Sequence, residues 1–397
     1  MISWPAAVFV IAFPAIAVAQ VDPAEAPRDP TAADLEPELA IGIRAVTSVN
    51  GVLRDGGATS AIDFSDTYVF LRPRIAMYES NLRAGALFAI TFPDVYDEPG
   101  TLFLADAHAF LDHRYGTLRL GRGRLKSRLI PMPTLRDDDL IRYTDVPNPF
   151  SEGIGTADLQ YGNTVDLSLW PAPRWYVEVH AENLASSALR PADERAFRIN
   201  SLGFDAGYRQ IPGLAPMSAI RQLAIGTNVY HVDTAAQTWT TDMLAAAWLG
   251  LVLDPVHAVD LRAQAMYSFG IENVVLDTPA ATQQARAVAA VASIGYTYRR
   301  RLLPAWRTNV IGGYRRYTEV ERDQWSIAGN VFHTIGATVE VGLQYQFQRR
   351  DAAIPSAFGD DQEHSIKLAL TGSFETVFGR LFDERDSLLN TEGGYLP

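Results

Sequence analysis

The sequence predicts an all-β fold, a transmembrane antiparallel up-and-down β-barrel of about sixteen strands, an even number as in single-chain bacterial barrels. Three observations predict it. Apolar and polar residues alternate at period two, in segments of about ten residues, between residues 38 and 378. Short and long links between these segments alternate along the chain. No uninterrupted apolar stretch of about 18 residues follows the first twenty residues, so strands rather than helices are left to cross a membrane.

The alternation is clear in the segment 66–78. Val69, Leu71 and Ile75 fall on one face of a strand, and Arg72 and Arg74 fall on the other. Lipid outside and water inside would satisfy both faces, although a soluble sandwich alternates in the same way. The predicted strands are 38–49, 66–78, 82–92, 101–113, 116–126, 157–170, 174–183, 197–209, 220–232, 239–253, 257–270, 286–300, 306–318, 324–333, 337–349 and 364–378.

The links give an independent test, because outer-membrane barrels join their strands alternately by short periplasmic turns and longer outer loops. Short links are expected at 79–81, 114–115, 171–173, 254–256 and 334–336. Long links are expected at 50–65, 127–156, 184–196, 271–285 and 350–363. The link 210–219 is longer than a turn requires and departs from the pattern.

The predicted outer surface has features of a membrane interface. Tryptophans lie near strand ends, where an amphipathic ring suits an interfacial girdle, although a core role fits them as well; these are Trp170, Trp175, Trp306 and Trp325. The small apolar residues 245–247 would either pack against a neighbouring copy or face lipid.

Four regions are expected along the chain. Residues 1–19 read as a signal peptide, because a short apolar run ends in the small-x-small pattern Ala17-Val18-Ala19. Residues 20–37 are rich in Pro, Ala, Asp and Glu and read as a mobile leader. The barrel is expected over 38–378, followed by a polar C-terminal tail over 379–397.

Composition narrows the classes of function. The chain has 34 Lys and Arg against 46 Asp and Glu, a formal charge of −12, which argues against a nucleic-acid partner. It has no cysteine, so neither a disulfide nor a thiolate metal site is available. Common catalytic and cofactor motifs are missing, so we expect no enzyme, catalytic residue, metal or cofactor. The enzyme alternative is a barrel hydrolase that uses His180 beside Glu178 and Glu182.

A lumen of about sixteen strands is too wide for side chains to fill, so a further element is expected to narrow it. The candidate is the long link 127–156, which follows a strand rich in arginine. We predict a constriction wall of Arg72, Arg74, Arg119, Arg122 and Arg124. The predicted constriction loop contributes Asp137, Asp138, Asp139, Asp145 and Glu152.

Within the strand 116–126 and the residue before it, five residues match an aromatic-Gly-x-Leu-x-x-Gly-Arg stretch: Tyr115, Gly116, Leu118, Gly121 and Arg122. Here the sequence resembles the general porins of Gram-negative outer membranes, whose third loop folds inward. The resemblance implies a basic wall that includes Arg122, facing acidic loop residues 137–139. It also implies a homotrimer surrounded by outer-membrane lipid and lipopolysaccharide.

Two features depart from that family. Strict alternation places Arg122 on the same face as Leu118 and Leu120, so it points inward only if the glycines at 121 and 123 allow a bulge. Porins usually end on an aromatic residue that closes the last strand. Here Phe374 and Phe378 would take that role, and a polar tail follows.

The expected function is therefore an outer-membrane channel for passive diffusion of small hydrophilic solutes and ions. The alternative is a substrate-specific channel for anions or sugars, in which the arginines form a ladder for the solute. Two simpler interpretations stay open. In one, the arginines of the predicted wall lie at the outer rim of the barrel and bind lipid phosphates. In the other, the aspartates of the predicted loop are simply solvated or bind Ca²⁺ loosely.

Overall fold

The computed structural model describes residues 35–54, 57–63, 67–77, 82–91, 103–113, 115–124, 161–172, 174–184, 201–210, 220–235, 238–273, 282–300, 303–318, 322–335, 338–350 and 362–378. Within these residues the chain forms seventeen strands. They are β1 (Leu35–Arg54), β2 (Gly57–Asp63), β3 (Tyr68–Met77), β4 (Leu82–Thr91), β5 (Phe103–His113), β6 (Gly116–Arg124), β7 (Tyr161–Ala172), β8 (Trp175–Leu184), β9 (Ser201–Gln210), β10 (Ile220–Ala235), β11 (Thr238–Val252), β12 (His257–Asn273), β13 (Thr282–Arg300), β14 (Leu303–Tyr317), β15 (Arg322–Ile335), β16 (Val339–Arg350) and β17 (Gln362–Phe378). The described residues contain no helix with the length and hydropathy that a membrane-spanning helix needs.

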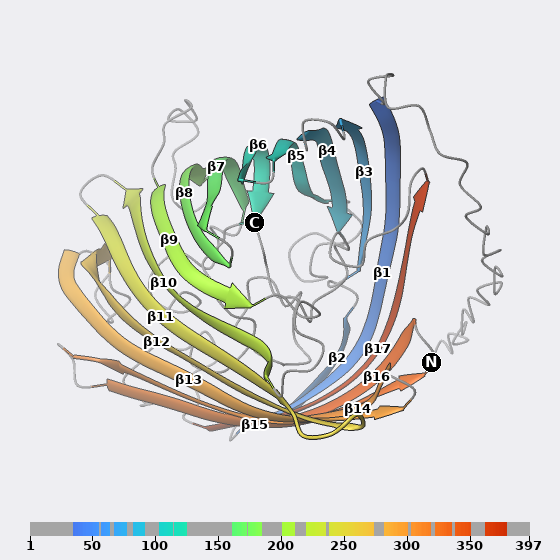
Figure 1. Ribbon diagram of the computed structural model, residues 1–397. Helices are drawn as coiled ribbons and strands as arrows, with labels where there is room; N and C mark the ends of the chain where they lie inside the picture. Colours follow the sequence, from blue (N-terminus) through green and yellow to red (C-terminus); the bar gives the residue numbers. More distant parts are fainter. Residues whose placement is uncertain are drawn as a thin grey trace, which may run out of the picture.

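The strands form one closed antiparallel sheet. From β3 to β17 each strand pairs with the next along the chain, and β1 pairs with β17 from Leu39↔Phe378 to Arg54↔Glu363. Figure 1 shows β1, in blue, beside β17, in red, where the sheet closes on itself. Because β2 and β3 share one edge of β1, the seventeen strands make a barrel of sixteen. The predicted barrel is confirmed, and each predicted strand overlaps an observed one.

The prediction was wrong over residues 50–65. This stretch was expected to be a long link, but β1 continues to Arg54 and β2 pairs back onto it as a hairpin. The pair Arg54↔Gly57 leaves only residues 55 and 56 between the strands, and their sequence is Asp-Gly. That dipeptide is among the strongest signals for a two-residue hairpin link.

A threonine lies at the interruption between β2 and β3. The hydroxyl of Thr67 accepts a hydrogen bond from the backbone N–H of Val46 and donates one to the carbonyl oxygen of Val46, both at 3.0 Å. Backbone groups inside a sheet need partners, because leaving them unpaired away from water is unfavourable. The Thr67 side chain thus supplies β1 with hydrogen bonds where the neighbouring strand is broken.

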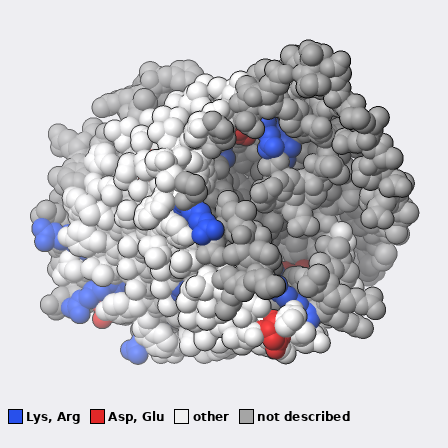
Figure 2. All heavy atoms as spheres, viewed as in Figure 1, with Lys and Arg blue, Asp and Glu red and all other residues white. Residues whose placement is uncertain are grey.

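The two faces of the sheet differ in polarity. The outer face is apolar, with exposed side chains that include Val69, Leu71, Ile75, Val165, Leu167, Leu169, Val310, Ile327, Leu343, Ile366, Leu368 and Leu370. Figure 2 shows a broad part of the described surface without charged side chains. The other face, which we name the inward face, carries buried polar residues such as Arg72, Arg74, Asp166, Ser168, Gln264, Ser268, Gln344 and Gln346. The strands alternate as predicted, and an apolar exterior is what a barrel in lipid requires.

The inward face is not polar throughout. Leu244, Met266, Val291, Ile311 and Ala328 form a buried apolar stripe across β11, β12, β13, β14 and β15. Met266, for example, lies between the inward residues Gln264 and Ser268 on β12. This side of the barrel therefore departs from a simple division into an apolar outer face and a polar inward face.

Aromatic side chains gather at both ends of the barrel. At the end with the short links, the ring centroids of Trp175 and Tyr208 lie 5.3 Å apart, and Trp306 stacks on His333 at 4.1 Å. At the opposite end, Trp325 packs on Phe347 at 5.1 Å. Trp175, Trp306 and Trp325 are exposed on the outer surface, where their amphipathic rings suit the two membrane interfaces.

Candidate functional site

Two of the predicted wall residues lie side by side on β3. Arg72 and Arg74 are 9% and 8% exposed, whereas Leu71 and Ile75 beside them are exposed at 40% and 48%. Since successive side chains of a strand point to opposite faces, both arginines belong to the inward face. The strand thus carries two fixed positive charges on the inside of the barrel.

Arg119 is a third arginine on the inward face. It is half-buried on β6, two residues from the buried Thr117. Its register partners are Phe110 on β5 and Asp166 on β7. Directly opposed residues of an antiparallel pair have Cβ atoms about 4.5–5.5 Å apart, so Arg119 and Asp166 are cross-strand neighbours. We name Arg72, Arg74 and Arg119 the wall arginines.

For Arg122 and Arg124 the structure describes the backbone but not the side chains. Arg122 pairs with Ala107 and Asn163, and the ladder runs through it without a register shift. The bulge that would turn Arg122 inward is therefore absent from these pairings. Gly121 has φ 144°, and a Cβ there would lie 2.4 Å from the carbonyl oxygen of Ala107, so this position requires glycine.

The predicted constriction loop lies outside the described residues. This applies to Asp137, Asp138, Asp139, Asp145 and Glu152, and to the inward fold expected of residues 127–156. The signal peptide, almost all of the leader and the polar tail also fall outside them. What the structure describes of the candidate site is therefore the barrel wall.

A cluster of acidic residues around one histidine lies next to the wall arginines. We name Asp166, Glu178, His180 and Asp205 the acidic–histidine cluster; they come from β7, β8 and β9 and are at most 6% exposed. The register places Asp166 opposite His180 and Glu178 opposite Asp205. The Oδ2 atom of Asp205 lies 3.7 Å from Nδ1 of His180.

Neighbouring side chains hold these carboxylates. The hydroxyl of Thr164 donates to Oδ1 of Asp166 at 2.5 Å, and that of Ser168 donates to Oε2 of Glu178 at 3.1 Å. Asn228 on β10 donates from its side-chain amide to Asp205. Sequence reasoning placed Asp166 on a polar strand face and grouped His180 with Glu178, but it did not join these strands and it missed Asp205. The available signal was the polar alternation on three consecutive strands.

These contacts bear on the hydrolase alternative. A serine nucleophile needs a base that takes its proton, usually a histidine. Ser168 on β7 is diagonal to His180 on β8, and its hydroxyl donates a hydrogen bond to Glu178 instead. The side chain of Glu182 lies outside the described residues. The arrangement therefore resembles a hydrogen-bonded wall more than a nucleophile with its base.

A network of neutral amides covers another part of the inward face, and we name it the amide network. Asn309 donates to Asn330 at 2.8 Å, Asn330 to Gln344 at 3.3 Å, and Gln344 to Gln346 at 3.5 Å. Beside it, Arg315 donates to Gln324. Arginines and carboxylates thus line β3 to β9, whereas β14 to β16 combine this amide network with Arg315 and with an ion pair between Arg307 and Glu340.

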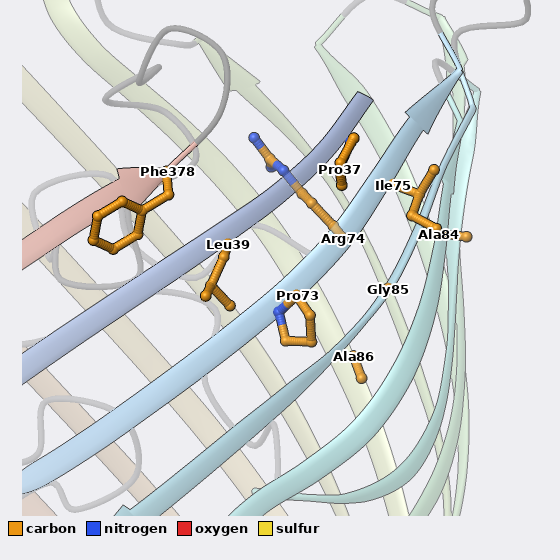
Figure 3. Close-up of a pocket in the computed structure, with 9 residues that line it drawn as sticks. All are labelled: Pro37, Leu39, Pro73, Arg74, Ile75, Ala84, Gly85, Ala86 and Phe378. Atoms are coloured by element: carbon orange, nitrogen blue, oxygen red, sulfur yellow. The ribbon is translucent and has the colours of Figure 1, made fainter. Parts of the chain in front are cut away.

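The outer wall has a shallow apolar hollow of about 710 Å³ over β1, β3, β4 and β17. It is lined by Pro37, Leu39, Pro73, Arg74, Ile75, Ala84, Gly85, Ala86 and Phe378. Figure 3 shows Leu39 and Pro73 on the opposite side of the sheet from the extended Arg74 side chain. The small residues at 84–86 make this part of the outer surface recessed.

Comparisons with known proteins identify the fold. No protein-family model and no curated protein matches the sequence. An anion-selective porin from Comamonas acidovorans matches with a TM-score of 0.62 at 11% identity, over 85% of this chain and 100% of that one. The outer membrane channel DcaP of Acinetobacter baumannii matches at 0.55 and 14%, over 85% and 97% of the two chains.

A trimer form of OmpT, an outer membrane protein of Vibrio cholerae, also matches with a TM-score of 0.55 at 9% identity, over 85% of this chain and 99% of that one. Identities this low establish the fold alone. A closed barrel with an apolar exterior satisfies every backbone group within the sheet, as a membrane demands. The chain thus has the fold of these outer-membrane porins, a closed antiparallel barrel of sixteen strands.

Proposed function

We propose that the barrel forms a water-filled channel through which small hydrophilic solutes and ions cross the outer membrane by passive diffusion. One observation carries the proposal: a closed barrel of this strand number places charged and amide side chains inside and apolar side chains outside. Barrels of about 16 strands are too wide for wall side chains to fill and leave an aqueous channel.

The conduction of ions tests this function. Purified, refolded protein is added to a planar lipid bilayer, and current is recorded at constant voltage. Stepwise increases in current are expected as single barrels insert, whereas the same protein denatured by heat gives none. A correctly folded sample without stepwise conductance would contradict the channel.

The charges of the inward face are proposed to set ion preference at a constriction. Arginine does not lose its proton at any pH the protein meets, so the wall arginines act as fixed charges. Arg122 and Arg124 stay proposed wall residues, Arg122 because the resemblance to porins implies it. Both lie at positions that alternation puts on the face of Leu120, so this part of the proposal requires the strand to turn their side chains inward after Gly121. Asp137, Asp138, Asp139, Asp145 and Glu152 are proposed to face them from the constriction loop. Charged rings of this kind select ions by sign.

A channel specific for an anionic solute such as phosphate is the second candidate. The observation that favours it is the position of Arg72, Arg74 and Arg119 on neighbouring parts of the inward face. The solved porin of Comamonas acidovorans is itself anion-selective. Reversal potentials with chloride against phosphate distinguish the two: a general pore passes chloride more readily, whereas a phosphate-specific channel favours phosphate.

We also propose that the barrel assembles as a homotrimer through its outer face. The recessed apolar hollow over β1, β3, β4 and β17 offers a surface for a second copy. The alanines at 245–247 are less suited, because Ala246 is inward and 5% exposed, so only Ala245 and Ala247 reach the outer surface. Native mass spectrometry of the protein in detergent is expected to give three chains per particle, and a single chain would contradict this assembly.

Lipopolysaccharide is the proposed lipid partner. Exposed arginines lie near the ends of β13, β14 and β16, at the end of the barrel that carries the long links: Arg286, Arg316 and Arg349. The guanidinium group binds phosphate through paired hydrogen bonds. Long links face the outside in outer-membrane barrels, so these arginines are at the height of the lipid A phosphates. Replacing all three with glutamine is expected to reduce co-purifying lipopolysaccharide, measured by its phosphate content.

A further inference from the structure

We propose that Asp166, Glu178 and His180 bind one divalent transition-metal cation of the Zn²⁺ class in the inward wall. Each residue offers one ligand atom, and these atoms all lie within 4.8 Å of one another. All three side chains are buried, with His180 fully so. Among the described residues, this is the group whose donor atoms converge in this way.

The sheet brings these residues together through register. Asp166 on β7 lies directly opposite His180 on β8, and Glu178 is two residues before His180 on the same face. Directly opposed and diagonal neighbours of an antiparallel pair are within reach of each other's side chains. Three donors from two rigid strands are thereby presented to one point without any contribution from a link.

The histidine ring has space because its other neighbour is a glycine. Gly203 on β9 lies opposite His180, and a Cβ at this position would be 1.7 Å from Nε2 of the ring. A glycine inside a strand weakens the strand and often marks a close approach by another group. Here the space over Gly203 is occupied by the imidazole, so the position of the ring depends on this residue.

The donor set indicates the class of cation. Zn²⁺ accepts histidine nitrogen and carboxylate oxygen at about 2.0–2.2 Å. Ligands around such an ion lie about 3–4 Å apart, so small side-chain rotations bring the three donors into place. Ca²⁺ and Mg²⁺ prefer sites made of oxygen alone, which disfavours them beside an imidazole. The chain has no cysteine to offer a thiolate.

The surroundings orient the donors. The Thr164 hydroxyl donates a hydrogen bond to Asp166 at 2.5 Å, and the Ser168 hydroxyl donates one to Glu178 at 3.1 Å. Asp205 stands 3.7 Å from Nδ1 of His180 and itself accepts from Asn228. Groups of this kind around metal ligands fix their orientation and raise affinity. Asp205 is thus placed either to orient the imidazole or to add a further oxygen ligand.

Isothermal titration calorimetry tests the proposal on the full chain, folded in detergent and freed of metal with EDTA. ZnCl₂ is expected to bind with one ion per chain, and CaCl₂ and MgCl₂ to bind more weakly. His180→Ala and Asp166→Asn should each weaken Zn²⁺ binding by about 100-fold or more. Loss of a residue that only supports a ligand can already lower metal affinity by about 100-fold, and loss of a ligand itself should cost at least as much. Gly203→Ala retains every donor but displaces the ring, and it should also weaken binding. Gly312→Ala is its control, because a Cβ there meets nothing within 4 Å, and it should bind Zn²⁺ like the wild type.

Heat-modifiable migration on gels checks that each variant is folded, and Glu178→Gln provides a further ligand variant if His180→Ala does not fold. Absence of stoichiometric Zn²⁺ binding by the wild type would overturn the proposal. Unchanged binding in folded His180→Ala, or equal affinity for Ca²⁺, would overturn it as well. Conductance of the same samples distinguishes the two proposals. Stepwise current without Zn²⁺ binding would contradict the metal site but still support the channel.

Discussion

Arg119 on β6 and Asp166 on β7 are directly opposed residues on the inward face of the barrel. They mark a boundary between the wall arginines on one side and the acidic–histidine cluster on the other. Opposite charges on adjacent wall strands produce a local field, which a low-dielectric wall strengthens in a narrow passage. The predictions on ion selectivity follow from this boundary.

Neutralising the wall arginines is expected to shift ion preference toward cations. The triple variant Arg72→Gln, Arg74→Gln and Arg119→Gln removes three fixed positive charges from the inward face. Reversal potential in a KCl gradient across a planar bilayer measures the shift. A double variant of the outward residues Arg286 and Arg316 serves as control and should leave the potential unchanged. An unaltered potential in the triple variant would place the wall arginines away from the ion path.

Neutralising the neighbouring carboxylates is expected to act in the opposite direction. Asp166→Asn and Glu178→Gln remove negative charge next to Arg119, so the reversal potential in the same gradient should move toward anions. Asp323→Asn is a suitable control, because Asp323 pairs with Arg316 at the outer edge, where Nε and Oδ1 are 3.9 Å apart. A shift toward cations in the double variant would show that these carboxylates do not act on passing ions as fixed charges.

The two faces of β16 are expected to tolerate charge differently. Leu343 is outward and 51% exposed, near the middle of the strand, whereas Gln346 is inward and 2% exposed. Leu343→Arg should lower the free energy of unfolding by about 2–4 kcal/mol, the cost of arginine at the middle of the bilayer. Gln346→Arg, opposite the small residues Ala328 and Ser365, should cost less and change conductance. Urea unfolding in lipid vesicles measures both, and equal losses would contradict the assignment of faces.

The hydroxyl of Thr67 is expected to contribute to stability. Thr67→Val keeps the shape of the side chain but removes both hydrogen bonds to Val46, at a cost of about 1–2 kcal/mol in the free energy of unfolding. Thr59→Val on the exposed face of β2 is the matched control and should be neutral within about 0.5 kcal/mol. Unfolding in urea compares them. If both variants lose the same amount, Thr67 does not support the interruption between β2 and β3.

Much of the fold could be predicted because the residues of a strand alternate in polarity between its two faces. Leu343 and Gln344 differ in polarity because one meets lipid and the other the barrel interior. The hairpin of β1 and β2 was missed because residues 50–65 were assigned as one long link, although the dipeptide Asp55-Gly56 itself signals a turn.

The site was less predictable, because strand register is a property of the whole sheet. Asp205 lies opposite Glu178 only through the pairing of β8 with β9, which no local pattern specifies. Met266 is inward and apolar because it packs with Leu244 and Ile311 from other strands, so polarity alone could not predict that stripe. Arg74, in contrast, was placed correctly on the inward face because its position depends on alternation within one strand.

The dependence of single-channel conductance on salt tests the central claim most directly, because an aqueous lumen conducts in proportion to the ions in bulk solution. Single insertion events are recorded in planar bilayers at several KCl concentrations. A hollow barrel predicts stepwise conductance that rises almost linearly with KCl concentration. Folded, inserted protein that gives no current at any concentration would contradict it and would mean that the interior is closed.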